Sequence, residues 1–112
     1  MTKVSFVVHK RPDMSRDEFR RYWRDVHGPI AAKLPGLRKY VQNHSLPDPA
    51  AGELPCDCIA ELWFDSPEAM QAGFASPEGA ATTADIPNFL DPDRVGMMVV
   101  DDFSLFFNAF FC

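Results

Sequence analysis

Residues 15–40, SRDEFRRYWRDVHGPIAAKLPGLRKY, decide how this chain folds. Ser15 followed three residues later by Glu18 forms the capping-box pattern that starts a helix. Behind this cap, four apolar residues recur at helical spacing, and we expect them on one buried stripe: Phe19, Trp23, Val26 and Ile30. Because His27 lies four residues after Trp23, the spacing predicts that its imidazole projects from the same buried face.

The dipeptide Gly28-Pro29 comes directly after this histidine. Proline lacks an amide hydrogen, and the residue before a proline avoids helical angles, so we expect the helix to break or kink here. A short second segment should continue from Pro29 to Leu34, where Pro35-Gly36 stops it. An imidazole that faces the core at the end of a broken helix is the sharpest functional signal in the sequence.

The other elements follow from apolar alternation and from helix-start signals. Strands are predicted at residues 3–10, 37–45, 58–64 and 95–107. Ser-Pro-Glu at 66–68 and again at 76–78 starts two helices, the second running from Pro77 to Asp85. Residues 46–55 are predicted as a surface loop and 86–92 as an apolar loop that closes over the domain. This order predicts an α+β, ferredoxin-like βαββαβ fold, with an antiparallel four-stranded sheet and a single domain over residues 1–112.

Alternation along the strands predicts which side chains share a face. In the first strand Val4, Phe6 and Val8 point one way and His9 the other. In the second strand the polar and aromatic side chains gather on one face, like the wall of a pocket: Arg38, Tyr40, Gln42 and His44. The helices should cover only one side of the sheet. We expect aromatic residues such as Tyr40 or Trp63 on the open side, which favours a homodimer formed through that face.

Composition excludes several classes of protein. With 46% hydrophobic and 12% aromatic residues, the chain is globular. No apolar run approaches the ~18 residues of a membrane span, and the N-terminus lacks a signal-peptide pattern, so we expect no membrane partner. Three cysteines, Cys56, Cys58 and Cys112, are interpreted as reduced thiols of a cytoplasmic protein.

Charge is distributed unevenly along the chain. Residues 1–39 hold ten Lys and Arg against four Asp and Glu, whereas residues 40–112 hold one against twelve. A nucleic-acid-binding protein needs a dominant basic face, and we expect no nucleic-acid partner. The asymmetry leaves two readings, a mixed solvated surface or complementary charge within the fold or between two copies.

Two motifs carry a family resemblance. The elements Phe19-x3-Trp23-x3-His27-x-Pro29 and Leu34-Pro35-Gly36-Leu37-Arg38-x-Tyr40-Val41-Gln42-Asn43 resemble the EthD family, and the likeness extends over roughly residues 3–107. The resemblance implies a dimeric α+β barrel, in which two sheets pack face to face, and a pocket between the sheet and helices of each protomer. It also implies that the family's histidine corresponds to His27 and its strand tyrosine to Tyr40. Relatives in this superfamily include lactone isomerases, polyketide cyclases, cofactor-free monooxygenases and haem-degrading enzymes.

The candidate residues have both a chemical and a structural interpretation. His27 is a general acid/base or a satisfied core histidine, and Tyr40 holds a substrate oxygen or simply fills the wall. Five further residues are predicted to bind substrate, with surface, interface or core packing as the alternative: His9, Trp23, Gln42, His44 and Trp63. No pair of His or Cys has ligand spacing and no glycine-rich phosphate loop occurs, so we expect neither a metal nor a cofactor.

The sequence favours a small enzyme that acts on a hydrophobic, carbonyl-bearing small molecule by acid/base chemistry at His27. Its reaction would be of the isomerase, cyclase or cofactor-free oxidoreductase type. The alternative is a non-catalytic dimeric protein that binds a ligand or serves an oxygenase in ether or aromatic degradation. A haem- or oxygen-using monooxygenase is the third and least favoured reading.

Overall fold

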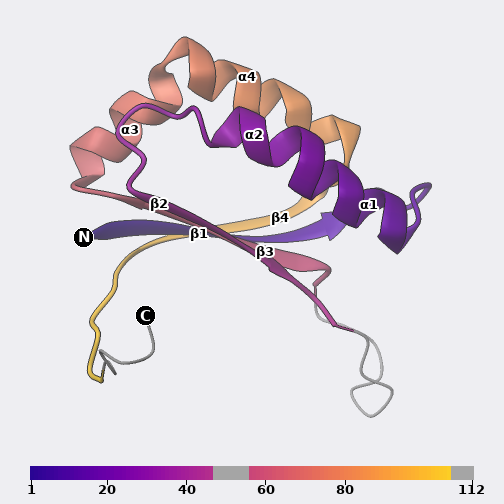
Figure 1. Ribbon diagram of the computed structural model, residues 1–112, viewed down its shortest axis with the longest axis horizontal. Coiled ribbons are helices and arrows are strands. Elements are labelled where there is room, and N and C mark those ends of the chain that lie inside the picture. Colours follow the sequence, from indigo (N-terminus) through magenta and orange to yellow (C-terminus); the bar gives the residue numbers. More distant parts are fainter. Residues whose placement is uncertain (47–55, 107–112) are drawn as a thin grey trace.

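The computed structural model describes residues 1–46 and 56–106, which contain one antiparallel sheet with strand order β2-β3-β1-β4. Its strands are β1 (Thr2–Lys10), β2 (Lys39–His44), β3 (Cys58–Phe64) and β4 (Leu90–Asp101). Helices connect β1 to β2 and β3 to β4, and all of them lie over the same face of the sheet (Figure 1). The predicted ferredoxin-like βαββαβ arrangement is therefore confirmed.

The first helical connection is continuous through Pro29, so the predicted break is wrong. The helix widens into a π turn before the proline instead of ending there. It comprises α1 (Arg16–Tyr22), the π-helical turn η1 (Trp23–His27) and α2 (Gly28–Ala31). In η1 the Gly28 N–H donates to the carbonyl of Trp23, five residues earlier. A proline ring presses on the carbonyl four residues before it, and the wider π turn makes room for that ring.

The π turn also changes which side chains are buried. Trp23 and His27 face the sheet, whereas Val26, predicted on the buried stripe, is 43% exposed. Widening the turn rotates the residues that follow it relative to an ideal α-helix, so the 3.6-residue period fails here. The start of α1 matches the sequence, because the Ser15 hydroxyl accepts from the Glu18 N–H at 3.1 Å.

The second helical connection comprises α3 (Pro67–Ala75), α4 (Pro77–Asp85) and the 3₁₀ turn η2 (Ile86–Asn88). Both predicted helix starts are confirmed. The Ser66 hydroxyl accepts from the Ala69 N–H at 3.1 Å, and the Ser76 hydroxyl accepts from the Gly79 N–H at 3.0 Å. Each serine thus satisfies an amide that the first turn of a helix leaves free.

Strand β4 lies earlier in the chain than the sequence predicted. It begins at Leu90, where the sequence indicated a loop, and ends at Asp101 instead of residue 107. Leu90 pairs with Lys10 beyond a register shift in which β4 holds the extra residues, and Leu90 and its neighbour Phe89 are buried. Pro92 is compatible with this strand because β4 lies at the edge of the sheet.

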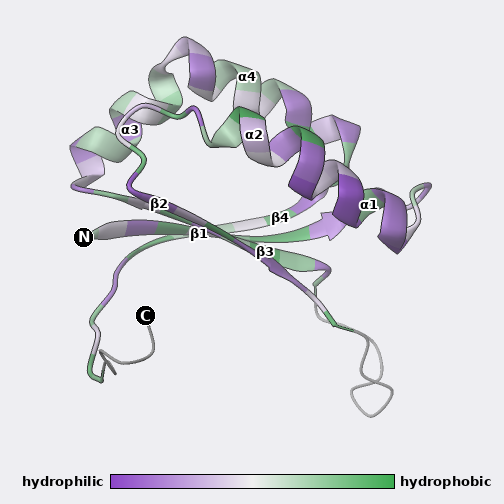
Figure 2. Cartoon of the chain, viewed as in Figure 1, coloured by the Kyte–Doolittle hydropathy of each residue, from purple (hydrophilic) through white to green (hydrophobic). Residues whose placement is uncertain are grey.

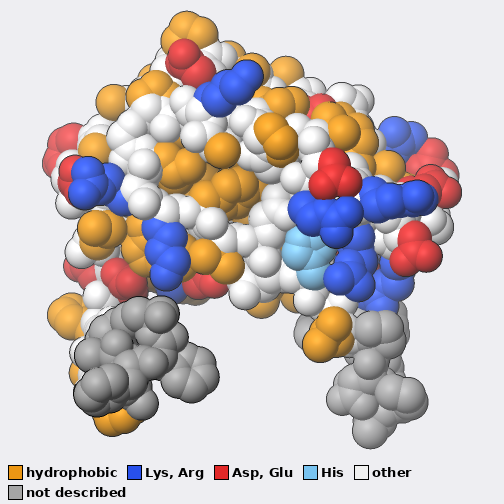
Figure 3. Space-filling view, in the orientation of Figure 1, with side chains coloured by type: hydrophobic (Ala, Val, Ile, Leu, Met, Phe, Trp, Pro, Cys, Tyr) orange, Lys and Arg blue, Asp and Glu red, His pale blue; other side chains and the backbone are white. Residues whose placement is uncertain are grey.

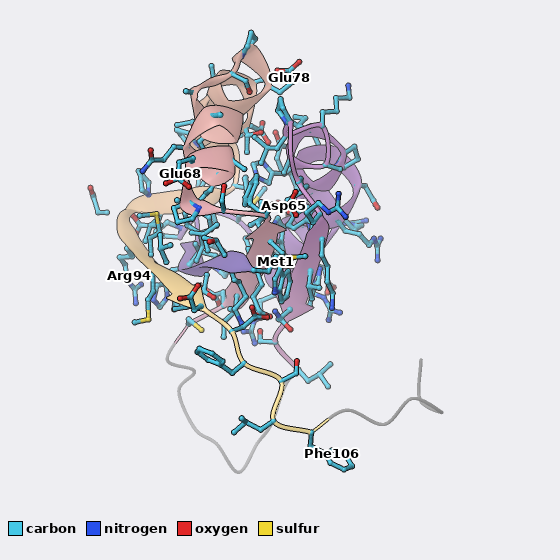
Figure 4. The ribbon with its side chains drawn as sticks, turned by 90° about the vertical axis from the view of Figure 1, so that its left-hand side faces the viewer. Met1, Asp65, Glu68, Glu78, Arg94 and Phe106 are labelled. Carbon is cyan, nitrogen blue, oxygen red and sulfur yellow. The ribbon has the colours of Figure 1, made fainter. Side chains whose placement is uncertain are left out.

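Beyond β4 the chain leaves the sheet. Phe103, Leu105 and Phe106 are almost fully exposed, and Figure 4 shows Phe106 well away from the strands. The predicted apolar tail at 108–112, Cys112 and most of the predicted loop 46–55 lie outside the described residues. Cys56 and Cys58 are free thiols.

The core lies between the sheet and the helical layer. Its buried side chains come from every strand except β2, from the helical connections and from Leu34: Val4, Val8, Phe19, Trp23, Leu34, Cys58, Ala60, Leu62, Phe64, Phe89 and Leu90. The helix α1 is mostly hydrophilic (Figure 2). Lys and Arg side chains gather at the end of the molecule where α1 lies (Figure 3). Within the described residues no helix is long and apolar enough to cross a membrane.

Candidate functional site

A cavity of about 320 Å³ lies between the helical layer and the sheet. Side chains from all four strands and from the helical connections line it, and most of them are apolar or aromatic: Phe6, Val8, Trp23, His27, Ala31, Tyr40, Ala60, Leu62, Phe74, Thr82, Thr83, Ile86, Val95 and Met97. A small apolar cavity with a few polar groups is the usual form of a small-molecule site.

His27 projects from η1 into the wall of this cavity and is paired with Asp85 at the end of α4. The distance from His27 Nδ1 to Asp85 Oδ2 is 2.8 Å, and both side chains are buried. A carboxylate can only accept, so the short contact places the proton on Nδ1. Nε2 is then left with a free lone pair, which is the state a general base requires.

Asp85 is held in turn by two further donors. The Tyr22 hydroxyl donates to its Oδ1, and Asn88 Nδ2 donates to the same oxygen at 2.9 Å. Both carboxylate oxygens are therefore occupied, which fixes the orientation of the group that holds the imidazole. The sequence analysis missed Asp85. Its available signal was an acidic residue in the last turn of a helix, where the helix dipole disfavours negative charge.

The electrostatics of the pair favour a neutral imidazole beside an ionised carboxylate. Burial lowers the pKa of His27 below its ordinary value, and the hydrogen bond and charge of Asp85 only partly offset this. Burial acts to raise the pKa of Asp85, but hydrogen bonds from Tyr22, Asn88 and His27 outweigh it and hold that pKa low. His27 is thus ready to accept a proton at neutral pH.

A second polar network reaches the cavity from β2. Gln42 Nε2 donates to the Trp23 carbonyl at 2.9 Å and to the Tyr40 hydroxyl at 3.0 Å. Because a carbonyl only accepts, the first contact fixes which end of the amide is the NH₂ group. Gln42 Oε1 accepts a hydrogen bond from the Nε2–H of His44 at 3.0 Å.

This network sets the role of Tyr40. Its hydroxyl accepts from Gln42, so its own proton remains available to a molecule in the cavity. Burial raises the pKa of Tyr40, with donors on Gln42 and Trp23 opposing the shift, and the hydroxyl stays protonated at neutral pH. Tyr40 is therefore a hydrogen-bond donor on the opposite wall of the site from the helix that carries His27.

Gly28 allows the two networks to approach each other. A Cβ at this position would lie 3.0 Å from Gln42 Nε2 and 3.2 Å from the Trp23 carbonyl. Both are closer than ordinary carbon contacts, so a side chain here would displace the Gln42 amide. Both residues of the Gly-Pro dipeptide therefore shape the site. Pro29 follows the π turn that buries His27, and Gly28 leaves room for the Gln42 side chain of β2.

The structure brings five of the predicted site residues together. Trp23, His27 and Tyr40 line the cavity. Gln42 lies behind Tyr40, and the His44 ring packs 4.5 Å from the ring of Trp23.

Two other predicted binding residues, His9 and Trp63, are not among the residues that line the cavity. Strand alternation places both on the open face of the sheet. His9 Nδ1 lies 3.7 Å from an oxygen of Asp57, and the Trp63 ring lies beneath the ammonium groups of Lys3 and Lys39. The expectation that Tyr40 occupies this open face is wrong, because β2 directs it toward the helices.

The residues described here, 1–46 and 56–106, contain no group of three His, Cys, Asp or Glu side chains close enough to hold a metal ion. The polar groups of the site include the imidazole–carboxylate pair, the Tyr40–Gln42–His44 network and the hydroxyls of Thr82 and Thr83.

The chain is a ferredoxin-like domain that carries a histidine–carboxylate pair in the wall of an apolar cavity. The model of the EthD domain matches residues 11–93, and the chain belongs to this family. It is 28% identical over 103 residues to an uncharacterised 11.0 kDa protein from the thcB-thcC intergenic region of Rhodococcus erythropolis, covering 91% of this chain and 95% of that one.

Solved structures share the fold. An EthD family protein from Bacillus halodurans superposes with a TM-score of 0.76 at 22% identity, covering 92% of this chain and all of that one. A dimeric ferredoxin-like protein of unknown function from Thermobifida fusca has a TM-score of 0.67 at 17% identity, covering 88% of each chain. At these identities the likeness concerns the fold alone.

Proposed function

We propose that this protein is a small enzyme that moves a proton on a hydrophobic carbonyl compound, with His27 as the base and Tyr40 as the group that polarises the carbonyl oxygen. One observation carries the proposal: the His27–Asp85 pair, at 2.8 Å, stands in the wall of an apolar cavity, and Nε2 has no hydrogen-bond partner among the described residues. Asp85 is a positioning residue, because it acts through the imidazole.

The proton transfer can be written as one step. The proton leaves the carbon next to the substrate carbonyl, or a hydroxyl conjugated with that carbonyl, and a new N–H bond forms at His27 Nε2. The electron pair of the broken bond shifts onto the carbonyl oxygen, which becomes an enolate-type oxyanion. Asp85 stabilises the imidazolium that forms, and the Tyr40 hydroxyl donates to the oxyanion. Return of the proton to another atom of the substrate completes an isomerisation. In a cyclisation the enolate carbon attacks a second carbonyl of the same molecule, and the oxygen of that carbonyl takes the proton from His27.

Hydrogen–deuterium exchange tests this step without knowledge of the natural substrate. Purified protein in D₂O is mixed with the ketone 1-tetralone, and exchange next to the carbonyl is followed by NMR. Replacing the base, as His27→Gln, should slow exchange by roughly 10²–10⁴-fold, the usual contribution of general acid–base catalysis. His9→Gln removes an imidazole from the open face of the same sheet and should leave the rate unchanged.

Two results would contradict the proposal. Exchange that is as fast in His27→Gln as in the natural chain would assign the base to another group. If a ketone binds but no exchange occurs above the protein-free rate, the protein is a ligand-binding or accessory module instead of an enzyme.

We also propose that two copies associate through the open face of the sheet, as the family's barrel arrangement implies. Apolar side chains on this face are left in contact with solvent in the single chain, among them Val7 and Ile59. The fold relative from Thermobifida fusca is dimeric, which supports association of two copies. His9 and Trp63 would then lie at or near the interface between copies.

A further inference from the structure

Among the described residues that line the cavity, none is Lys, Arg, Asp or Glu. The carboxylate of Asp85 is hydrogen-bonded to the His27 ring, which lines the cavity. A carboxylate ligand would lose its water, meet no cation and be repelled by Asp85, so the site selects against anions.

Four residues with polar side chains line the cavity, His27, Tyr40, Thr82 and Thr83, and the first two have opposite polarity. His27 Nε2 can only accept, because Nδ1 holds the ring proton for Asp85. Tyr40 donates, because Gln42 already donates to its oxygen. Thr82 cannot take over the role of donor, since its hydroxyl proton is used on the carbonyl of Glu78 at 2.9 Å.

Both groups need a partner when a ligand displaces water from the cavity. A C–H bond does not satisfy the lone pair of Nε2, whereas an O–H bond does. A ligand that lacks either the matching donor or the matching acceptor leaves one buried group unpaired, which weakens binding by roughly tenfold. The best ligand therefore presents a hydroxyl to His27 and a carbonyl oxygen to Tyr40.

The shape of the cavity limits the body of the ligand. Its volume lies at the small end of the ~300–1,000 Å³ typical of small-molecule sites. Aromatic rings from three elements, Phe6, Trp23 and Phe74, contribute to the walls and favour a flat apolar partner.

We infer that the ligand is a neutral compound of one or two rings in which a hydroxyl is conjugated with a carbonyl, the hydroxyl donating to His27 and the carbonyl oxygen accepting from Tyr40. This inference rests on the proposed function insofar as it names the substrate class for the same site. The inference adds to that function which ligand group donates a hydrogen bond to His27 and which accepts one from Tyr40.

A matched series of ring compounds tests the inference by binding alone. The probes are 6-hydroxy-1-tetralone, 1-tetralone with only the acceptor, tetrahydronaphthol with only the donor, tetralin with neither, and the analogue with a carboxylate in place of the hydroxyl. The chain has two tryptophans, and Trp23 lines the cavity. A Trp63→Phe chain therefore reports occupancy through the fluorescence of Trp23 alone.

We expect the hydroxy ketone to bind most tightly, each single-function probe to bind about tenfold more weakly, and the carboxylate to bind about a hundredfold more weakly. Adding Tyr40→Phe should weaken both ketones by about tenfold and leave tetralin unchanged.

Equal affinities across the series, or a carboxylate that binds best, would overturn the inference, as would the failure of every probe to bind. If the affinities follow the expected order while deuterium exchange is absent, the ligand class stands and the proposed catalysis fails.

Discussion

Side chains alternate between the two faces of the sheet, and those on one face are buried whereas those on the other face are partly exposed to solvent. Toward the helices, Val4 of β1 and Phe64 of β3 are shielded from solvent, the latter completely. On the open face of the same two strands, Val7 is 41% and Ile59 is 38% exposed. The difference comes from the helical layer, because period-two alternation supplies apolar residues to both faces and the helices cover only one.

Polar groups differ between the faces in the same way. On the helix side, His27 and Asp85 are buried and geometrically fixed at 2.8 Å. On the open face Lys3 pairs with Glu61 at 3.0 Å while both stay partly exposed, and such pairs contribute little. Proton transfer at a shifted pKa requires the dry, fixed environment of the covered face.

Truncating the two faces in parallel gives the largest expected contrast. Phe64→Ala removes a fully buried ring that packs 5.8 Å from the ring of Phe74 and should cost about 3–5 kcal/mol of unfolding free energy. Ile59→Ala on the open face of the same strand should cost clearly less in the dissociated chain. Urea unfolding at low protein concentration measures both. Equal losses would show that the open face is as fully buried as the core.

A charge placed on the open face tests what covers it. Val7→Lys should reduce association between copies by at least about tenfold, because an unpaired ammonium would be desolvated at the interface. Sedimentation across a range of concentrations measures the change in mass. Gln71→Lys adds the same charge on the exposed surface of α3 and should leave association intact. A natural chain that sediments as a monomer at all concentrations would contradict the proposed dimer.

The sequence predicted those parts of the fold that local chemistry determines. β3 and α4 were predicted with the boundaries that the structure shows, since both have abrupt signals at their ends. β4 was misplaced because Pro92 indicates a loop, and only pairing of Leu90 with Lys10 reveals the strand. The exposure of Val26 was missed because nothing local distinguishes a π turn from an α turn.

The candidate site was predictable only in part, for a similar reason. His27 was found because apolar spacing and the following proline are local features. Asp85 lies 58 residues away along the chain, and its contact with His27 exists only after the two helical connections pack together. His9 and Trp63 were assigned to the site by residue type, whereas the face of the strand places them on the other side of the sheet.

Acidification should lower the unfolding free energy of the protein through the histidines that pack on the covered face. The pKa of His27 is lowered by burial, and that of His44 by burial and by Arg20 and Arg24. The unfolded chain therefore binds protons at higher pH than the folded chain, and stability should fall as the pH drops below about 6.5. The lowered pKa of Asp85 adds a further loss below about pH 3.9.

Urea unfolding between about pH 7 and about pH 5 isolates the contribution of the two imidazoles from that of the carboxylates. His27→Gln and His44→Gln should each flatten part of the slope, and the double variant should flatten most of it. An unchanged slope in the double variant would assign the acid sensitivity to other groups.

The smallest expected effect concerns the cations over Trp63 on the open face. Lys39 Nζ lies 4.8 Å from the ring centroid, and an exposed cation–π contact of this kind is worth about 0.5–1 kcal/mol. Lys39→Ala should therefore lower the unfolding free energy of the dissociated chain by that amount or less, while Lys39→Met keeps the aliphatic stem and isolates the charge. A loss above about 2 kcal/mol would mean that the contact is desolvated. In that case side chains on the open face of the isolated chain would be shielded from water as they are on the covered face. The two faces would then differ in residue type but not in exposure to solvent.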